Sequence, residues 1–261
     1  MPGWSAFVNL LFQILQQIYY VVGDWGLAII VFTVAVRLLL TPLMVKQVRS
    51  MAELQKVQPL IKEVQEKYKD DKELAQQKQM ELMAEHKVNP FASCLPMLLQ
   101  MPIFIAFYQM LANETIRDGV VSRAGGPLFQ YLHTSGGMGS FYNIIPNIML
   151  SASSVFDSGK GFLAAIPYFI LLAIFALSIY IPQMMQHNTE KSQKMMSLYM
   201  SVFMLFIGWS VPAGVLLYWD TSSIIGIAQQ WFVQRQMKKA TEDEEDVVEI
   251  VEVKKSKKSK N

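Results

Sequence analysis

The sequence predicts an all-α membrane protein with five transmembrane helices, an N-terminal interfacial helix and a cytoplasmic helical hairpin. Hydrophobic residues make up 52% of the 261 residues and only 17% are charged, which is too apolar for an ordinary soluble domain. Several apolar stretches approach the roughly 20 residues that a helix needs to cross a bilayer. The charged residues gather in a few segments between and after these stretches, a pattern typical of a polytopic membrane protein.

The predicted first span, residues 25–44, carries a single charge, Arg37. An arginine in the middle of a membrane helix costs about 2.5–3.5 kcal/mol on insertion scales. Thr33, Arg37 and Thr41 are spaced four residues apart and therefore share one helical face. We expect this polar stripe to face a water-filled cavity or a polar partner rather than lipid. The alternative is that Arg37 reaches a lipid headgroup or forms a purely structural pair.

Residues 4–22 are predicted to form an amphipathic helix that lies in the plane of the membrane interface. Its polar side chains follow one helical stripe: Asn9, Gln13, Gln16, Gln17 and Tyr20. Gly23 and Gly26 then indicate a turn before the first span. The alternative is one continuous helix through both segments, which the two glycines disfavour.

A helical hairpin in the cytoplasm is predicted for residues 45–90. Apolar residues recur every three or four positions over 51–68, and Lys69-Asp70-Asp71 is a turn signal before a second helical run. Pro59 is expected to kink or interrupt the first arm. The hairpin is either a solvated charged element or a docking surface for partners.

The other four spans are predicted over residues 93–112, 162–185, 195–211 and 213–233. The outer loop over 113–160 joins the second span to the third, and its apolar pieces at 127–132 and 141–150 are expected to form interfacial helices. Pro212-Ala213-Gly214 is a tight joint, so we expect the fourth and fifth spans to be antiparallel neighbours.

The basic residues predict the orientation in the membrane. Nine Lys and Arg residues lie in 44–89, two in the 186–194 link and eight near the C-terminus, whereas the opposite side has only Arg117, Arg123 and Lys160. The positive-inside rule therefore places the N-terminus outside and the C-terminus in the cytoplasm of a bacterial plasma membrane. No basic segment precedes the first apolar run, so either a signal was removed or the first span directs targeting.

The C-terminal tail, residues 238–261, is predicted to be disordered because it holds few apolar residues. An acidic block over 242–246 precedes a basic end. The basic end either contacts anionic lipid or RNA phosphates, or is simply solvated. The candidate cytoplasmic contact residues are Met80 and Met83 of the hairpin, with adaptable apolar side chains, and Lys254, Lys255, Lys257 and Lys258 of the tail.

The sequence contains no recognisable catalytic motif of the nucleophile, zinc-protease or phosphate-loop type, and no paired aspartates within the spans. One cysteine and three separated histidines offer no metal-ligand spacing. We therefore expect no catalytic residue, metal or cofactor. Asp220 is the only charge besides Arg37 within a span; we expect it near the outer interface and not paired with Arg37.

Three stretches resemble the YidC-type (Oxa/Alb/YidC) insertase family: WGLAIIVFTVAVRLLLTPL (25–43), VNPFASCLPMLLQMPIFIAFY (88–108) and VPAGVLLYW (211–219). The resemblance covers nearly all of 4–237. It implies a five-span core around a hydrophilic groove that opens to the cytoplasm and lipid. The expected groove residues are Arg37, Thr33, Thr41, Gln100, Ser201 and Trp219, with Arg37 matching the family's groove arginine. The outer loop and Asp220 depart from the expected pattern.

The resemblance further implies that the chain inserts and helps fold nascent membrane proteins, alone or with the Sec translocon, often beside a ribosome that contacts the hairpin and the basic tail. Two other classes remain open. A small-solute or ion transporter built around Arg37 predicts inverted repeats, of which the sequence shows none. A structural scaffold for other membrane complexes needs no insertion activity.

Overall fold

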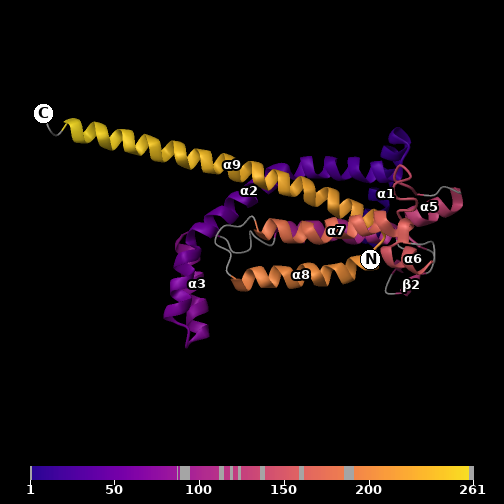
Figure 1. The fold of residues 1–261 in the computed structure, drawn as a ribbon, viewed down its shortest axis with the longest axis horizontal. Helices are drawn as coiled ribbons and strands as arrows, with labels where there is room; N and C mark the ends of the chain where they lie inside the picture. Colours follow the sequence, from indigo (N-terminus) through magenta and orange to yellow (C-terminus); the bar gives the residue numbers. More distant parts are fainter. Residues whose placement is uncertain are drawn as a thin grey trace. The chain divides into compact units, whose positions relative to one another are not determined.

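The computed structural model describes residues 2–86, 88, 95–111, 115–117, 120–122, 125–135, 139–158, 162–184 and 191–258. These residues form nine α-helices and one two-stranded sheet, shown in Figure 1. In chain order the elements are α1 (Pro2–Val22), α2 (Trp25–Lys67), α3 (Lys72–Glu85), α4 (Leu95–Leu111), β1 (Thr115–Arg117), β2 (Val120–Ser122), α5 (Pro127–Ser135), α6 (Ala152–Asp157), α7 (Phe162–Met184), α8 (Lys191–Trp209) and α9 (Ala213–Lys258). The fold is all-helical apart from the two-stranded sheet, and the predicted all-α class is confirmed.

The chain divides into two compact units. Unit 1 contains Met1–Leu39 and Pro96–Gly226, and unit 2 contains Leu40–Leu95 and Ile227–Asn261. Long helices α2 and α9 each supply residues to both units. Thr33 and Arg37 of the polar stripe belong to unit 1, whereas Thr41 and the helical hairpin belong to unit 2.

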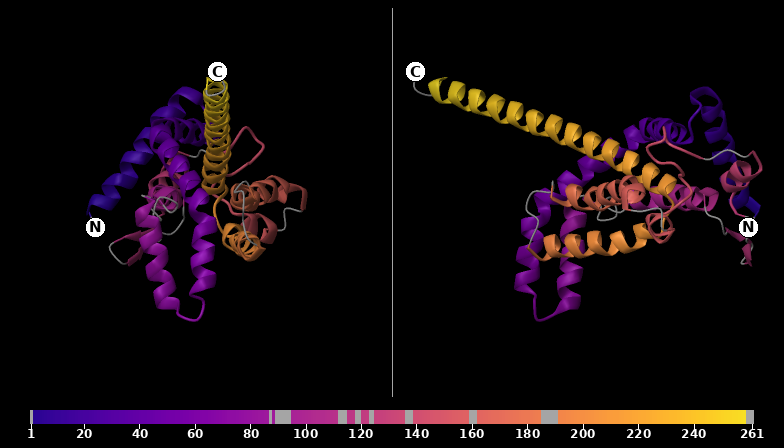
Figure 2. Two further views of the ribbon diagram at one scale, coloured as in Figure 1. Left: turned by 90° about the vertical axis from the view of Figure 1, so that its left-hand side faces the viewer. Right: turned by 45° about the vertical axis from the view of Figure 1, so that its right-hand side comes forward.

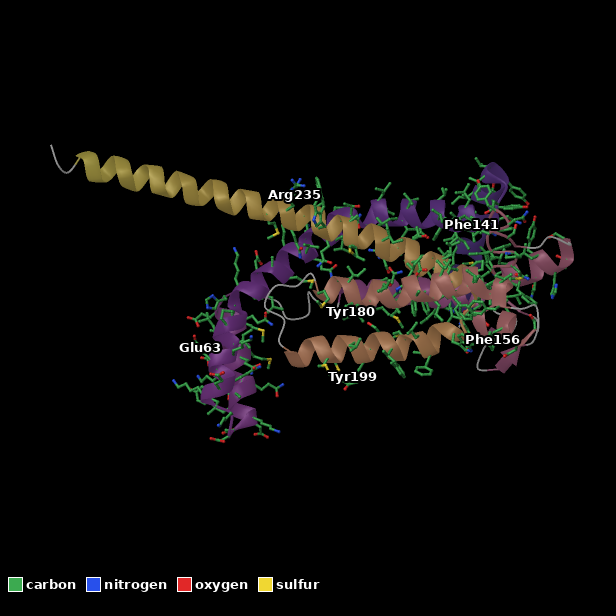
Figure 3. All side chains as sticks on the ribbon, in the orientation of Figure 1. Glu63, Phe141, Phe156, Tyr180, Tyr199 and Arg235 are labelled. Atoms are coloured by element: carbon green, nitrogen blue, oxygen red, sulfur yellow. The ribbon has the colours of Figure 1, made fainter. Side chains whose placement is uncertain are left out.

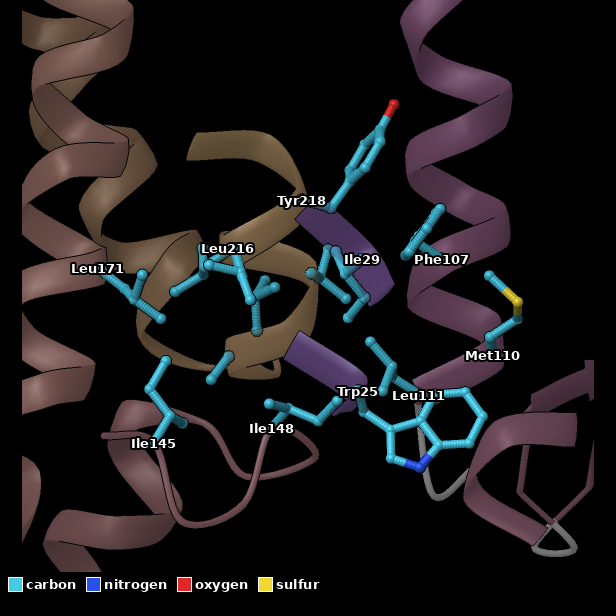
Figure 4. Packing of buried hydrophobic residues seen from close by; sticks show 14 of the residues in the cluster. Trp25, Ile29, Phe107, Met110, Leu111, Ile145, Ile148, Leu171, Leu216 and Tyr218 are labelled. Carbon is cyan, nitrogen blue, oxygen red and sulfur yellow. The ribbon is translucent and has the colours of Figure 1, made fainter. Parts of the chain in front are cut away.

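The core of unit 1 is an apolar cluster to which α1, α2, α4, α7 and α9 all contribute. The ring of Phe107 in α4 stacks on Tyr218 of α9, with ring centroids 4.4 Å apart, and also contacts Phe32 of α2 at 5.5 Å. Leu15 of α1 and Ile29 of α2 are completely buried. Figure 4 shows Ile29, Phe107 and Tyr218 converging from three helices. This packing fixes the helix segments that carry the polar residues described below.

The loop 139–151 contacts the beginnings of α2 and α9 in unit 1. Asp24 caps α2: one carboxylate oxygen accepts from the Leu27 amide at 2.8 Å, and the other accepts from the Tyr142 amide at 2.9 Å. The Gly26 amide donates to the Ser140 carbonyl at 3.2 Å. A Cβ at Gly26 would lie 2.4 Å from Cβ of Phe141, so only glycine allows this close approach.

Helix α1 lies across the direction of the bundle helices of unit 1. In the left view of Figure 2, α1 is seen along its length while α7 and α8 are seen end-on. Val8, Leu11 and Leu15 form its buried face, and the Trp4 indole N–H donates to the side-chain oxygen of Gln109 in α4 at 2.7 Å. The chain turns at Gly23, whose φ is +74°, so α1 and α2 are separate helices.

In unit 2, the second half of α2 and α3 form a hairpin, with the two arms side by side in Figures 1 and 2. The turn falls at residues 68–71, and Asp71 caps α3 by accepting from the Leu74 amide at 3.0 Å. Of the two outcomes expected at Pro59, the interruption is wrong, because α2 continues through it to Lys67. A kink at Pro59 stays a prediction. A proline removes one backbone donor, and no glycine or turn residue lies nearby to end the helix. The boundary expected between 25–44 and 45–90 therefore falls inside one helix.

Two other segments differ from expectation. Residues 141–150 do not form a helix, because Tyr142 and Asn143 adopt positive φ and the Ile144 amide closes a tight turn onto the Phe141 carbonyl at 2.8 Å. Residues 238–258, expected to be disordered, continue α9 as a helix. The Glu, Lys and Ala content of this stretch favours helix, and no glycine or proline interrupts it.

Among the described residues, three helical stretches are long and apolar enough to cross a membrane: Gly3–Val22, Trp25–Leu54 and Phe162–Pro182. The first of these stretches lies within the helix that is expected at the interface. Its length and composition alone make it a candidate span. Helix α4 has 17 residues, and the apolar part of α8 is Leu198–Trp209. Both are shorter than the 18 residues required of a candidate span. The total of five spans stays a prediction.

Candidate functional site

Arg37 of α2 forms a direct side-chain hydrogen bond to α9. Its Nε–H donates to the Ser222 hydroxyl at 2.7 Å, and Ser222 is buried with 3% of its surface exposed. An arginine keeps its charge in a protein. The structure therefore places a cation inside the apolar bundle with a neutral hydroxyl as the acceptor of its Nε–H.

The two threonines of the predicted stripe differ in their environment. Thr33 is buried in unit 1 and its hydroxyl donates to the Ile29 carbonyl of the preceding turn at 2.6 Å. Thr41 belongs to unit 2, where its hydroxyl accepts from the side-chain amide of Gln229 in α9 at 2.8 Å. Thr33 therefore bonds within its own helix, whereas Thr41 joins α2 to α9, the usual role of threonine between membrane helices.

Gln100 connects α4 to α9 near the same face. Its side-chain amide donates to the Tyr218 hydroxyl. Tyr218 lies one helical turn before Ser222, so the two residues share a face of α9. Polar contacts from α2 and α4 thus converge on adjacent turns of α9.

Trp219 faces α4 and α7. Its indole N–H donates to the Ser178 hydroxyl at 3.1 Å, and Ser178 in turn donates to the Phe175 carbonyl at 2.7 Å. The ring lies edge-on to Phe104 at 5.3 Å and to Phe175 at 5.5 Å. Four of the predicted groove residues are therefore joined to α9 or lie on it: Arg37, Thr41, Gln100 and Trp219.

Asp220 is buried inside the protein. Its side chain is 3% exposed, and neither carboxylate oxygen has a hydrogen-bond partner among the described residues. It lies two residues before Ser222, about 200° around the helix, so it points away from the face that holds Arg37. Its expected position near the outer interface stays a prediction, because burial among neighbouring helices does not fix its depth in the membrane.

The remaining predicted residues are distributed as follows. Ser201 of α8 is buried and lies in unit 1. Met80 of α3 is 59% exposed, and Met83 is half-buried beside it on the same helix. Lys254, Lys255, Lys257 and Lys258 lie on the last turns of α9. The six residues predicted as cytoplasmic contacts all belong to unit 2.

Helix α8 presents a continuous apolar surface. Its exposed apolar side chains are Met195, Met196, Leu198, Tyr199, Met200, Val202, Phe203, Phe206 and Ile207. Figure 3 shows Tyr199 pointing away from α8 and Phe156 near its far end. In water such a surface would be a liability, whereas lipid or another apolar segment covers it without cost.

Within the described residues, no three His, Cys, Asp or Glu side chains gather where they could hold a metal ion. The polar contacts of Arg37, Gln100 and Trp219 join α2, α4 and α7 to neighbouring turns of α9.

Fold and site together define a multi-pass, all-helical membrane protein with an arginine held inside its helix bundle. The chain belongs to the 60Kd inner membrane protein family, whose model matches residues 11–241. Proteins named membrane protein insertase YidC from Francisella tularensis subsp. novicida and Francisella philomiragia are each 34% identical to it over 232 residues. These matches cover 88% of this chain but 36% of each relative, so the chain spans about a third of their length.

The fold also matches a solved structure, titled "Active YidC insertase crystal structure with the first transmembrane domain resolved". The TM-score is 0.61 at 24% sequence identity, and the match covers 86% of this chain and 45% of the solved one. At this level of identity the likeness concerns the fold.

The sequence analysis did not single out Tyr218, Ser178, Ser222 or Gly226. Ser222, Gly226 and Tyr218 share one face of α9 at intervals of four residues, and this spacing is visible in the sequence. Thr221 and Ser223 offer similar groups on other faces, however, so the packing of α2 was needed to choose between them.

Proposed function

We propose that the chain is a membrane protein insertase that moves hydrophobic segments of nascent proteins from the cytoplasm into the bilayer. The observation that carries this proposal is Arg37, held in an apolar bundle by the Ser222 hydroxyl. A charge inside a bundle of membrane helices is costly and by default indicates a functional site. The family membership supports the same function.

In this mechanism a hydrophilic groove opens beside Arg37, with Thr33, Thr41, Gln100, Ser201 and Trp219 as further lining residues. The cation attracts acidic residues in the polar flank of a substrate, because charges interact strongly where water is scarce. The hydrophobic segment then leaves sideways along the exposed face of α8. Burial of its apolar surface in lipid supplies roughly 25 cal/mol per Å².

The proposed setting is a bacterial plasma membrane, with the N-terminus outside and the C-terminus in the cytoplasm. The partners would be nascent membrane proteins, lipids, the Sec translocon for some substrates, and a ribosome that contacts the hairpin and the basic end of α9. The chain would act as an insertase and chaperone without a catalytic residue or cofactor.

The test is insertion of a single-span substrate with an acidic flank by the purified chain in liposomes. Arg37→Ala is expected to reduce the initial rate about tenfold or more, because removing an attraction of about 1.4 kcal/mol costs a factor of ten. Arg37→Lys keeps the positive charge and is expected to retain more of the rate than Arg37→Ala.

A substrate with a neutral flank serves as the control, because its insertion is expected to depend much less on Arg37. Full-rate insertion of the acidic-flanked substrate by Arg37→Ala would exclude the electrostatic step. Flux of a small solute through these liposomes would favour a transporter, and neither insertion nor flux would favour a scaffold.

A further inference from the structure

The guanidinium of Arg37 contacts α9 at two positions one helical turn apart. Ser222 accepts the Nε–H at 2.7 Å. At Gly226, a Cβ would lie 3.2 Å from Nη1 and 3.4 Å from Cζ of Arg37. The guanidinium therefore lies against the bare backbone of α9 at Gly226, in a position that a larger side chain would occupy.

These two contacts restrain the cation more than either would alone. Ser222 and Gly226 are four residues apart and share one face of the helix. Because the guanidinium is rigid and planar, a hydrogen bond at Nε together with packing against Nη1 and Cζ restricts both its position and its tilt. The ammonium of a lysine has no such plane and cannot be oriented in this way.

We propose that Ser222 and Gly226 are positioning residues that hold the Arg37 guanidinium in place for acidic segments of a substrate. The inference rests on the proposed function and deepens it. A charge that is already fixed loses less conformational entropy when a substrate carboxylate binds. Ser222 supplies the hydrogen bond, and Gly226 supplies the space.

Arginine-specific NMR tests the geometry without any insertion assay. The chain contains five arginines, so ¹⁵N-arginine labelling of the full chain in nanodiscs yields few Nε–H signals. The Arg37 signal is the one that disappears in Arg37→Lys. We expect its Nε–H to exchange with water at least tenfold more slowly than that of Arg49, which is exposed on α2.

Ser222→Ala is expected to accelerate this exchange by about threefold to tenfold, the range for loss of one hydrogen bond. Ser222→Thr keeps the hydroxyl and is expected to retain slow exchange, which separates hydrogen bonding from misfolding. Ser223→Ala, one residue further along α9, is the matched control and is expected to leave the signal unchanged. Exchange that is insensitive to Ser222→Ala would overturn the role of Ser222.

Gly226 is tested with graded substitutions. Gly226→Ala requires the guanidinium to move by a few tenths of an ångström and is expected to shift the Arg37 signal slightly. Gly226→Val is expected to displace the side chain and to increase Nε–H exchange as Ser222→Ala does. Ala228→Val adds bulk at an exposed position of the same helix and is the control. An Arg37 signal unchanged in Gly226→Val would overturn the role of Gly226.

The insertion assay then connects position to function. Ser222→Ala and Gly226→Val are expected to slow insertion of the acidic-flanked substrate severalfold and that of the neutral-flanked substrate much less. An equal loss for both substrates would indicate a structural role and overturn the proposal. If Arg37→Ala inserted at full rate while the NMR results held, the electrostatic step would fail, but the two contacts on Arg37 would stand.

Discussion

Asp220 is the described residue whose environment is least expected for its chemistry. It is almost fully buried on α9, and neither carboxylate oxygen has a hydrogen-bond partner in the described part of the chain. Burying a carboxyl group without a partner costs free energy, and more so if the group is charged. The packing of the surrounding apolar residues therefore offsets a local penalty at this position.

Asp220→Leu is expected to stabilise the protein by about 1–3 kcal/mol, because a leucine of similar volume removes the unsatisfied oxygens. Thermal unfolding in nanodiscs measures the change. Thr221→Ala, at the neighbouring half-buried position, is a control that is expected to have a smaller effect. A lower unfolding temperature for Asp220→Leu would show that the carboxyl group makes a favourable contact in the folded molecule.

Arg37 shows the complementary case, in which a buried polar group does have a partner. Its Nε–H reaches Ser222, and the neighbouring turns of α9 bind Gln100 and Ser178 through Tyr218 and Trp219. At the scale of single residues, α9 therefore collects polar contacts from α2, α4 and α7 over little more than one turn, whereas Asp220 on its other side makes none.

Among the elements, α1 is the helix for which composition and arrangement disagree. Gly3–Val22 is long and apolar enough to span a membrane, yet α1 lies across the direction of α7 and α8 (Figure 2). If α7 and α8 cross the bilayer, α1 lies in its plane. Its exposed face mixes Leu10 and Ile14 with Asn9, Gln13 and Gln17, a mixture that suits the interface between lipid and water.

Cysteine labelling distinguishes the two arrangements of α1. The chain has one native cysteine, Cys94, which is first replaced by serine. In an interfacial helix on the outer surface, Gln13→Cys is expected to react with a membrane-impermeant maleimide added outside. In a spanning helix this position would lie near the bilayer centre and stay unlabelled. Val202→Cys, on the apolar face of α8, is the control that is expected not to react.

At the scale of the whole molecule, charge is strongly segregated along the chain although the net charge is only +2. The hairpin, the 186–194 link and the C-terminal part of α9 carry most of the basic residues. Basic segments beside a membrane bind anionic lipid or RNA phosphates mainly through electrostatics. The basic end of α9 would therefore act in recruitment rather than in the insertion step.

Replacing Lys254, Lys255, Lys257 and Lys258 together by glutamine tests this division. Ribosome binding, measured by co-sedimentation at low salt, is expected to weaken several-fold and to depend less on salt, because fewer phosphate contacts release fewer counterions. Insertion of a purified substrate into liposomes without ribosomes is expected to stay within about twofold of the unmodified chain, since electrostatic recruitment by these lysines plays no part in that assay. Unchanged ribosome binding would contradict the proposed role.

The sequence alone determined the all-helical class, the hairpin with its turn near Asp70, and the need for a polar environment at Arg37. These features follow from local periodicity, turn chemistry and the cost of placing a charge among apolar residues, which nearby residues are sufficient to reveal.

Only the tertiary structure decided which groups meet. It chose Ser222 over Thr221 and Ser223 as the acceptor of the Arg37 Nε–H, buried Asp220 among the helices, and laid α1 across the bundle. Each outcome depends on which face of one helix packs against another, and contacts between residues far apart in the sequence determine that face. Periodicity shows that a face exists, but the packing determines what it contacts.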